Sequence, residues 1–342
     1  MTPVDPAHEE LRRGTSQGFL AYALWGLFPL YFHALLPAGA FEILAHRILW
    51  TLVVCLLVLA VQQDWRWALE TLRNLRLSLG LGAAALLIAA NWVIYVFAVL
   101  TGRTYEGALG YFLNPLVTVA LGVIVLGERL RRLQWAAVTV GGAAAIYLSV
   151  AGGSFPWISL SLAFSFGLYG LTKNRVGARL TAIRSLTAET AILAPIALVI
   201  VAVLARRDET TFTGYGAGHT ALLLAAGVIT AIPLLLFAAA ARRIPLATVG
   251  LLQFVTPVLQ LLCGVLLLGE HVSVALWVGF GIVWVALALL SVDSIRAVRH
   301  HRHAVASGPP GPGAGQDGPG DDEDGPGDDN DIDDALATPE PL

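Results

Sequence analysis

The sequence has little charge, two cysteines and a single lysine, and each shortage argues against a class of protein. Only 13% of its 342 residues are charged and 56% are hydrophobic, whereas a soluble domain carries roughly 25% charged residues, so the chain is a membrane protein. Cys55 and Cys263 lie inside apolar runs, which fits neither a disulfide framework nor a metal site. The lysine, Lys173, is not part of a phosphate-binding Walker A loop, which argues against an ATP-driven pump.

The zinc-hydrolase motif H-E-x-x-H does not occur in the sequence. G-x-S-x-G occurs once, at Gly14 to Gly18, directly before the first apolar run and without the strand that precedes this motif in a serine hydrolase. The sequence therefore disfavours an enzyme, and we expect no cofactor, no bound metal and no nucleic-acid partner.

Hydropathy indicates ten membrane-spanning helices. The first run follows Arg12 and Arg13, but it is too long for the apolar region of a signal peptide. Residues 62–77 mix Trp and Leu with Arg and are typical of a short interfacial helix. The ten apolar runs, each near the roughly 20 residues that cross the hydrocarbon core as a helix, are 17–36, 40–61, 78–100, 105–126, 133–151, 155–172, 183–205, 219–241, 246–268 and 274–295.

Positive charge follows an alternating pattern that predicts the orientation. Seventeen Lys and Arg residues lie in the N-terminal segment 1–16, in the connections after the second, fourth, sixth and eighth spans, and after the tenth. The other connections hold three. Because cytoplasmic loops carry the excess of Lys and Arg, both termini are predicted to be cytoplasmic.

The C-terminal segment 299–342 is chemically different from the rest. It contains eleven Asp and Glu residues and no Lys or Arg after Arg302, so the net charge of -3 combines a basic membrane domain with an acidic tail. Its Gly, Pro and Asp content predicts a disordered cytoplasmic tail. The acids could bind divalent cations or basic partners, but no calcium-loop spacing supports this.

An internal repeat divides the membrane domain. Residues 109–128 align without a gap to 251–270 at an offset of 142, with eight of twenty positions identical. The same offset relates spans three to five to spans eight to ten. Since each half, 17–152 and 153–298, holds five spans, the second half enters the membrane from the opposite side, which predicts an inverted-topology repeat.

Several stretches resemble those of one transporter family. They include WGLFPLYFHALL, EILAHRILW, NWVIYVFAV, LAFSFGLYGLTKN and the long run from Glu106 to Trp135. In these the sequence is similar to EamA-type members of the drug/metabolite transporter superfamily, most closely the RarD branch. The resemblance implies an all-α, multi-pass protein of the inner membrane with ten transmembrane helices, built as two five-helix EamA repeats. Such a protein moves small organic solutes by a secondary mechanism. It implies nothing about the acidic tail.

Ionisable groups inside the predicted spans are candidates for charge or proton handling, since each costs at least about 2.5 kcal/mol to place in the membrane. Glu42 and His46 lie four apart on one helix face, with Arg47 beside them, and Glu106 begins the fourth span. Glu189 corresponds to Arg47 in the repeat, and we expect the two to compensate each other. A structural ion pair that fixes the second span is the alternative.

Polar and aromatic groups near the middle of the spans are candidates for binding the solute. Asn114-Pro115 is predicted to interrupt the fourth span, and Pro257 is predicted to interrupt the ninth, because proline removes a backbone donor; a packing kink is the alternative. The aromatic residues could instead belong to interfacial belts. The candidate substrate-binding residues are Trp25, Asn91, Trp92, Tyr95, Tyr111, Asn114, Tyr169, Gln253 and Thr256.

Glu128 and Glu270 end the fourth and ninth spans in a Gly-Glu pair. A carboxylate is unfavourable at a helix C-terminus, so each needs a specific partner. A structural turn is favoured over gating.

The interpretation that joins these features is a secondary transporter, an exporter of a small metabolite or drug. It works by alternating access in the lipid bilayer, with proton coupling as a hypothesis. The step from repeat architecture to transport is an analogy. A facilitative channel and a structural membrane protein are the alternatives.

Overall fold

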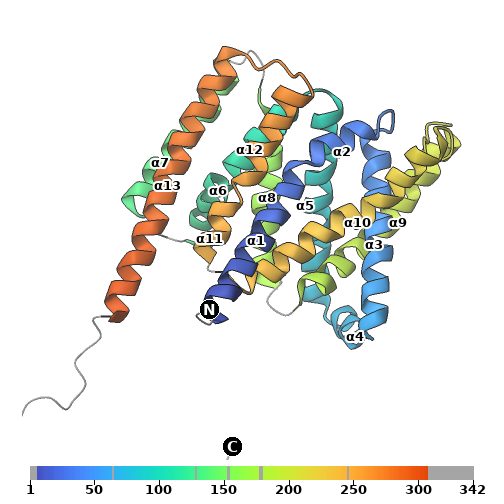
Figure 1. Cartoon of the computed structure of the whole chain (residues 1–342), viewed down its shortest axis with the longest axis horizontal. Helices are drawn as coiled ribbons and strands as arrows, with labels where there is room; N and C mark the ends of the chain where they lie inside the picture. Colours follow the sequence, from blue (N-terminus) through green and yellow to red (C-terminus); the bar gives the residue numbers. More distant parts are fainter. Residues whose placement is uncertain are drawn as a thin grey trace, which may run out of the picture. The chain divides into compact units, whose positions relative to one another are not determined.

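The computed structural model of the chain describes residues 6–63, 65–127, 129–151, 155–176, 180–244 and 246–306. In this part of the chain every regular element is a helix (Figure 1). Residues 1–298 form one compact unit. The predicted disordered tail starts at residue 299, but residues 299–306 belong to the last helix, which ends at Ala306. From Ser307 onward the predicted tail lies outside the described residues.

The helices follow one another with short connections. A helix at the predicted interfacial position is present as α4, and the side chain of Asn74 accepts a hydrogen bond from the Leu77 N–H at 3.1 Å where the next helix begins. The elements are α1 (Pro6–Gly26), α2 (Phe28–Ala34), α3 (Ala40–Gln62), α4 (Arg66–Arg73), α5 (Leu75–Leu100), α6 (Thr104–Leu126), α7 (Arg132–Ala151), α8 (Trp157–Val176), α9 (Ala182–Arg206), α10 (Gly216–Ala241), α11 (Leu246–Leu252), α12 (Val255–Leu262), the π-helix η2 (Cys263–Leu267) and α13 (Val274–Ala306).

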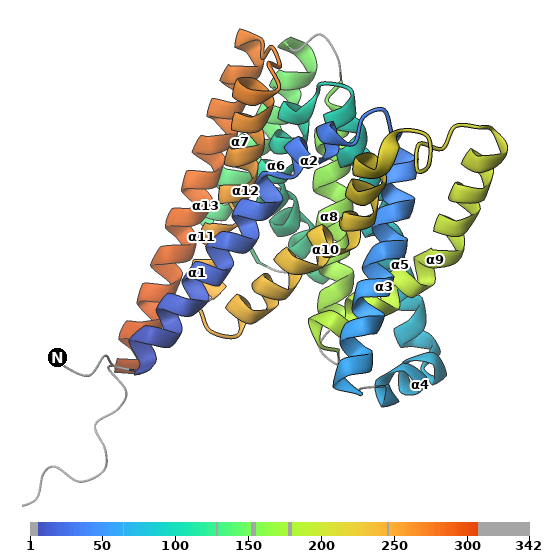
Figure 2. The same cartoon turned by 45° about the vertical axis from the view of Figure 1, so that its right-hand side comes forward.

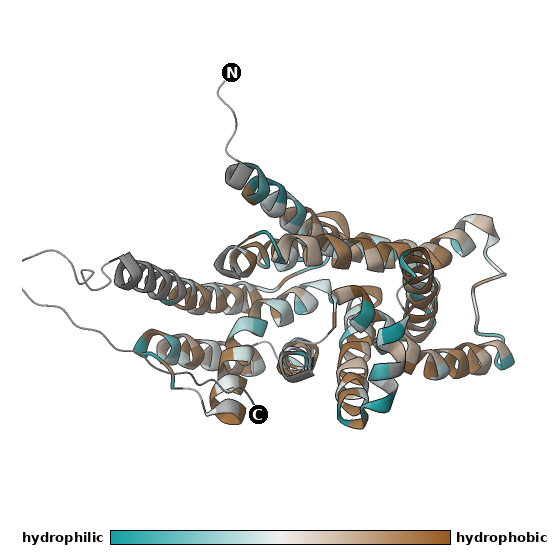
Figure 3. Ribbon diagram, turned by 90° about the horizontal axis from the view of Figure 1, so that it is seen from below, coloured by the Kyte–Doolittle hydropathy of each residue, from teal (hydrophilic) through white to brown (hydrophobic). Residues whose placement is uncertain are grey.

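Seven of the described helices are long and apolar enough to cross a membrane: α3, α5, α6, α7, α9, α10 and α13. Hydrophobic residues predominate along the helices in Figure 3. The other three predicted spans correspond to α1 with α2, to α8, and to α11 with α12 and η2. A multi-pass all-α membrane protein is therefore confirmed, while ten crossings remain a prediction.

Two predicted spans are broken into shorter helices. The first breaks at Leu27, directly before α2, which carries Pro29 in its first turn. The ninth breaks at Gln253 and Phe254, between α11 and α12. Pro257 lies four residues after Gln253, and a proline has no N–H to bond the carbonyl one turn earlier. The break in the ninth span thus falls where its proline predicts it.

The fourth span differs from its predicted form. α6 continues as one helix through Pro115, so the expected interruption at Asn114-Pro115 is wrong. Leu113 and Leu116, on either side of the proline, are buried in the main hydrophobic cluster. α6 also packs against α8 and α12, and this packing holds a regular path despite the missing donor.

Helices of the two halves pack in matching pairs. α5 packs on α8 as α10 packs on α1, α6 packs on α8 as α12 packs on α1, and α3 packs on α10 as α9 packs on α5. In these comparisons the repeat relates α1 to α8, α3 to α9, α5 to α10 and α6 to α12. Two further contacts, α3 with α9 and α6 with α12, join helices that are related to each other by the repeat. Figure 2 shows α3 and α9 on one side of the helical unit, with α10 crossing from α1 to α3.

A glycine sets the crossing of α3 and α10. A Cβ atom on Gly227 would lie 2.3 Å from the backbone oxygen of Trp50, so no side chain fits there. The backbones can therefore touch at this point. Thr230 follows Gly227 by three residues, and Arg47 precedes Trp50 by three, which brings these two side chains to the same crossing.

Candidate functional site

Arg47 of α3 occupies a buried aromatic cage. Its side chain is nearly inaccessible, with 4% of the residue surface exposed. The guanidinium carbon lies 4.1 Å from the ring centre of Trp92, 5.2 Å from that of Phe28 and 5.4 Å from that of Phe32. Its Nε donates a hydrogen bond to Thr230 Oγ1 at 2.9 Å. We call these five residues the Arg47 cage.

No ion pair involves Arg47 within the described residues. The predicted compensation by Glu189 is not a contact in this structure, because Glu189 is paired with a different cation. Cation–π contacts with three rings and one neutral hydrogen bond hold the guanidinium instead.

A chain of aromatic contacts leads from the cage to α5 and α6. Phe32 contacts Tyr95 at 6.1 Å between ring centres, and Tyr95 contacts Tyr111 at 5.3 Å. The Tyr95 hydroxyl is buried and has no hydrogen-bond partner among the described residues. The structure thus brings together five predicted site residues, Arg47, Trp92, Tyr95, Tyr111 and Asn91.

Asn91 fastens α5 to its neighbours. Its amide nitrogen donates to the Leu162 carbonyl and to Ser165 Oγ, both at 3.0 Å, and its oxygen accepts from the Tyr111 hydroxyl at 3.1 Å. With both ends of the amide used, the Asn91 contacts seen here are structural. Its role in binding a solute stays a prediction.

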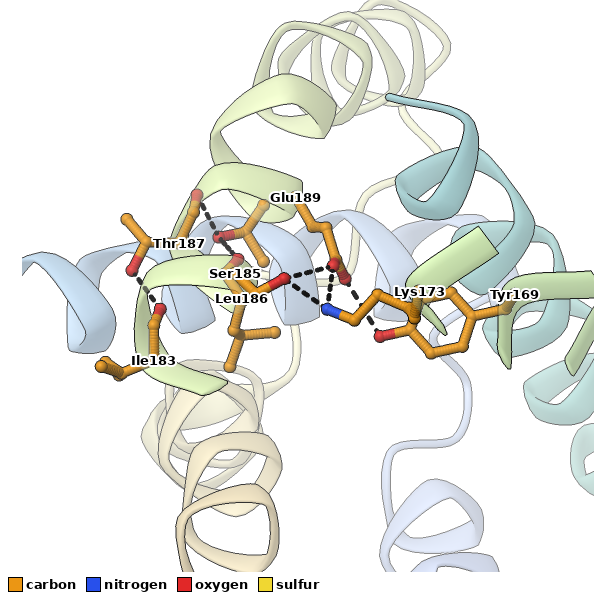
Figure 4. A network of polar contacts seen from close by, with 8 residues as sticks. Tyr169, Lys173, Ile183, Ser185, Leu186, Thr187 and Glu189 are labelled. Atoms are coloured by element: carbon orange, nitrogen blue, oxygen red, sulfur yellow. Dashed lines mark hydrogen bonds and ion pairs between the residues drawn. The ribbon is translucent and has the colours of Figure 1, made fainter. Parts of the chain in front are cut away.

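Glu189 of α9 lies in a second polar cluster with Tyr169, Lys173 and Ser185 (Figure 4). Its Oε1 is 2.6 Å from Lys173 Nζ and accepts from Ser185 Oγ at 3.0 Å, while Oε2 accepts from the Tyr169 hydroxyl at 3.2 Å. Lys173 Nζ also contacts Ser185 Oγ. Glu189 is 2% exposed. The carboxylate therefore has a cation and two neutral donors, and we call these four residues the Glu189 cluster.

Glu42 and His46 lie near the start of α3, against the connection between α9 and α10. Glu42 accepts three hydrogen bonds, from the N–H of Thr211 at 2.6 Å and from the hydroxyls of Thr210 and Thr211 at 2.9 Å each. The His46 ring stacks on Phe212 at 4.8 Å between ring centres. These contacts tie the connecting loop to the end of α3 that lies next to the Arg47 cage.

Glu270 finds its partner at the start of α6. Its two carboxylate oxygens accept from the backbone N–H groups of Thr104 and Tyr105 at 2.8 and 3.1 Å. These N–H groups carry the positive end of the helix dipole, which favours the structural role. Gly264 permits the approach, because its added Cβ would lie 2.8 Å from Glu270 Oε2. The repeat-related Glu128 lies outside the described residues.

Glu106 is bound locally. Arg103 contacts its Oε1 at 2.7 Å through Nε and at 2.6 Å through a terminal nitrogen. Its other oxygen is buried and has no partner in the part of the chain that the structure describes. Glu106 is thus separate from both the Arg47 cage and the Glu189 cluster in its polar contacts.

The remaining predicted substrate-binding residues lie outside these clusters, and two of them, Trp25 and Thr256, lie where α1 packs on α12. Thr256 donates to the Tyr22 carbonyl at 2.7 Å, and Trp25 packs edge-on against Tyr22 at 5.5 Å. Gln253 lies in the break between α11 and α12. The side-chain oxygen of Asn114 is buried without a partner among the described residues.

Sequence reasoning did not single out several residues that complete these sites. Phe28, Phe32 and Thr230 of the Arg47 cage read as ordinary apolar-span residues, since no local pattern links them to Arg47. Lys173 offered a signal, because a lone lysine four residues after Tyr169 shares its helix face. Thr211 lies in a loop, where pairing with Glu42 depends on tertiary structure.

The fold and these buried charges define a multi-pass helical membrane protein with ionic groups between its helices. The EamA-like transporter family matches the chain twice, at residues 12–150 and 156–292. The chain belongs to this family, in its RarD branch.

Known relatives match nearly the full length. A protein named RarD from Streptomyces exfoliatus is 47% identical over 305 residues, which cover 89% of this chain and 96% of that one. An uncharacterized transporter of Pseudomonas aeruginosa is 40% identical over 293 residues, covering 86% and 98%. A solved structure titled "Crystal structure of protein" matches with a TM-score of 0.54 at 19% identity, over 83% of this chain and 98% of that one. It shows the same fold.

Proposed function

We propose that this chain is a secondary transporter that exports a small organic solute across the inner membrane by alternating access. The observation that carries the proposal is the repeated packing: helix pairs of the first half recur, shifted by one repeat, in the second. Two such halves in opposite orientation can exchange conformations and open a shared site to either side in turn. Full-length similarity to proteins named as transporters supports the same conclusion.

The topology in this proposal has ten crossings, inverted repeats at 17–152 and 153–298, and both termini in the cytoplasm. It is testable with single cysteines, because the native Cys55 and Cys263 are buried. Tyr215→Cys, at a position 58% exposed between α9 and α10, should react with a membrane-impermeant maleimide in intact cells. Trp65→Cys, at a position 46% exposed before α4, should react only after lysis. The reverse pattern would contradict the orientation.

Proton coupling through a carboxylate remains part of the proposal. Of the three candidates, Glu106 and Glu189 each have a cation partner, whereas Glu42 is held by hydroxyl and amide groups. A carboxylate without a fixed cation can exchange a proton without leaving a second charge unpaired, which favours Glu42. Transport that ignores a pH gradient and survives Glu→Gln changes at all three positions would exclude coupling through them.

The substrate is best sought without bias. Metabolites should be compared between a deletion strain and its parent, and the compounds retained by the deletion strain tested in vesicles containing the purified protein. Saturable uptake with counterflow is expected of a carrier. Linear flux at channel rates would contradict alternating access and favour a facilitative channel.

A further inference from the structure

Arg47 is a buried cation without a counter-ion among the described residues. Its Nε is used by Thr230, and no hydrogen bond is found there for its two terminal nitrogens. A charge inside the membrane-spanning region is costly unless it is paired or faces water. Aromatic faces lower that cost but do not neutralise the charge.

The second repeat provides an internal comparison. Glu189 occupies the position 142 residues after Arg47, equally near the start of its own helix. It is just as buried, yet Lys173 lies 2.6 Å from it. Among the described residues, a counter-ion is therefore present at one of the two related positions and absent at the other.

The surroundings of Arg47 suit an apolar body attached to an anionic group. Trp92, Phe28 and Phe32 offer flat faces around the guanidinium. Tyr95, which is 2% exposed and packs on Phe32, holds a hydroxyl with no partner in the described part of the chain. A guanidinium whose Nε is occupied still presents two terminal nitrogens, the edge that binds a carboxylate by two parallel hydrogen bonds.

We propose that the Arg47 cage binds the carboxylate of an amphipathic organic acid, which is the missing counter-ion. One guanidinium balances a monoanion, and the aromatic rings contact the ring or hydrocarbon body of the acid. The inference rests on the proposed transport function, because the guanidinium is enclosed here and a change of access must admit the acid. It also specifies the substrate class of that transporter.

The first test needs no ligand and uses the purified full-length protein. Replacing an unpaired buried charge by an apolar side chain of similar length removes a desolvation cost. Arg47→Met should therefore keep or raise the Tm of the protein. Arg243→Met, which removes a surface arginine paired with Glu10, is the matched control and should leave the Tm unchanged. A Tm several degrees lower for Arg47→Met would show that the cation supports the fold and would overturn the inference.

The second test measures binding as the rise in Tm and by calorimetry. The probes are phenylacetate, indole-3-acetate and octanoate, each with its uncharged primary amide. The acids should bind the wild-type protein and the amides should not. Arg47→Met should weaken binding of the acids at least about tenfold, whereas Arg243→Met should not. Equal binding of acids and amides, binding unaffected by Arg47→Met, or no binding by any acid would overturn the inference. The comparison of acids with amides needs only the wild-type protein and does not depend on the stability of the variant.

The two proposals fail in different ways. Acids that bind through Arg47 but show no counterflow in vesicles would support the cage as an anion site and contradict the transport function. Counterflow of another solute that neither the acids nor Arg47→Met affects would support transport and overturn the anion site.

Discussion

The start of α3 and the start of α9 are related by the repeat, yet each holds a buried charge that is stabilised in a different way. Glu189 in α9 is neutralised by Lys173 and bonded by Ser185 and Tyr169. Arg47 in α3 is held by aromatic faces and one hydroxyl. The charge of Glu189 is therefore paired within the chain, whereas the charge of Arg47 has no anion beside it among the described residues. The difference indicates that duplication preserved the packing while the chemistry of the two positions diverged.

The energetic consequences of this difference are opposite in sign. Removing one partner of a buried ion pair leaves an uncompensated charge, which costs several kcal/mol. Removing a buried charge that has no partner takes away such a cost. The change in stability caused by substitutions at the two positions therefore distinguishes a buried charge that has a counter-ion from one that lacks it.

The largest effect is expected at Lys173. Lys173→Met leaves Glu189 buried beside two neutral donors, so the free energy of unfolding should fall by about 2–4 kcal/mol, near the lower end for buried pairs because the Lys173 side chain remains 26% exposed. Denaturant or thermal unfolding of the purified protein measures this.

A double substitution is the control for Lys173. Lys173→Met combined with Glu189→Gln removes both charges and should recover most of the lost stability. A double variant as unstable as Lys173→Met alone would mean that the methylene stem of the lysine, rather than its charge, stabilises α8 against α9.

A smaller effect is expected at Glu42, which lies in the first turn of α3, ahead of Arg47. Glu42→Gln replaces a carboxylate that accepts three hydrogen bonds by a neutral amide. Since bonds to charged acceptors are the stronger ones, the loss should be about 1–2 kcal/mol. It should appear as faster amide hydrogen exchange at Thr211 and Phe212, because Glu42 ties their loop to α3.

The neighbouring loop carboxylate gives a matched control. Glu209 is exposed, and Glu209→Gln should leave exchange in the loop unchanged. Equal protection of Thr211 in the wild type and in Glu42→Gln would mean that the stacking of Phe212 on His46, and not the carboxylate, holds the loop.

The sequence was sufficient for features that depend on local pattern. Hydropathy predicted an all-helical membrane protein, the resemblance of several stretches predicted its family, and Pro257 predicted the break between α11 and α12. Pro115 shows the limit of such reasoning, because packing of α6 against α8 and α12 keeps that helix continuous. The same proline signal gives different outcomes in different surroundings.

The site was predictable only in part, for a related reason. Burial of Arg47, Asn91 and Tyr95 follows from their place in apolar spans, and the structure gathers them. Their partners come from distant segments, as Thr230 does through the crossing at Gly227. A sequence without an alignment holds no signal for such pairs, and the expected partnership of Arg47 with Glu189 was drawn from repeat register alone.

The smallest effect is expected at Tyr169 and concerns the Glu189 cluster. Tyr169→Phe removes the hydroxyl that donates to Glu189 Oε2 at 3.2 Å but keeps the ring, which lies 5.6 Å from Lys173 Nζ. The carboxylate retains Lys173 and Ser185, so unfolding should become easier by only about 0.5–1.5 kcal/mol. Tyr215→Phe, at an exposed position, is the control for loss of a phenol and should change nothing measurable. If Tyr169→Phe costs as much as Lys173→Met, the cluster acts as one cooperative network in which every member is required. If it costs nothing, the ion pair alone satisfies Glu189, and the Tyr169 hydroxyl is free to serve a solute as the sequence first predicted.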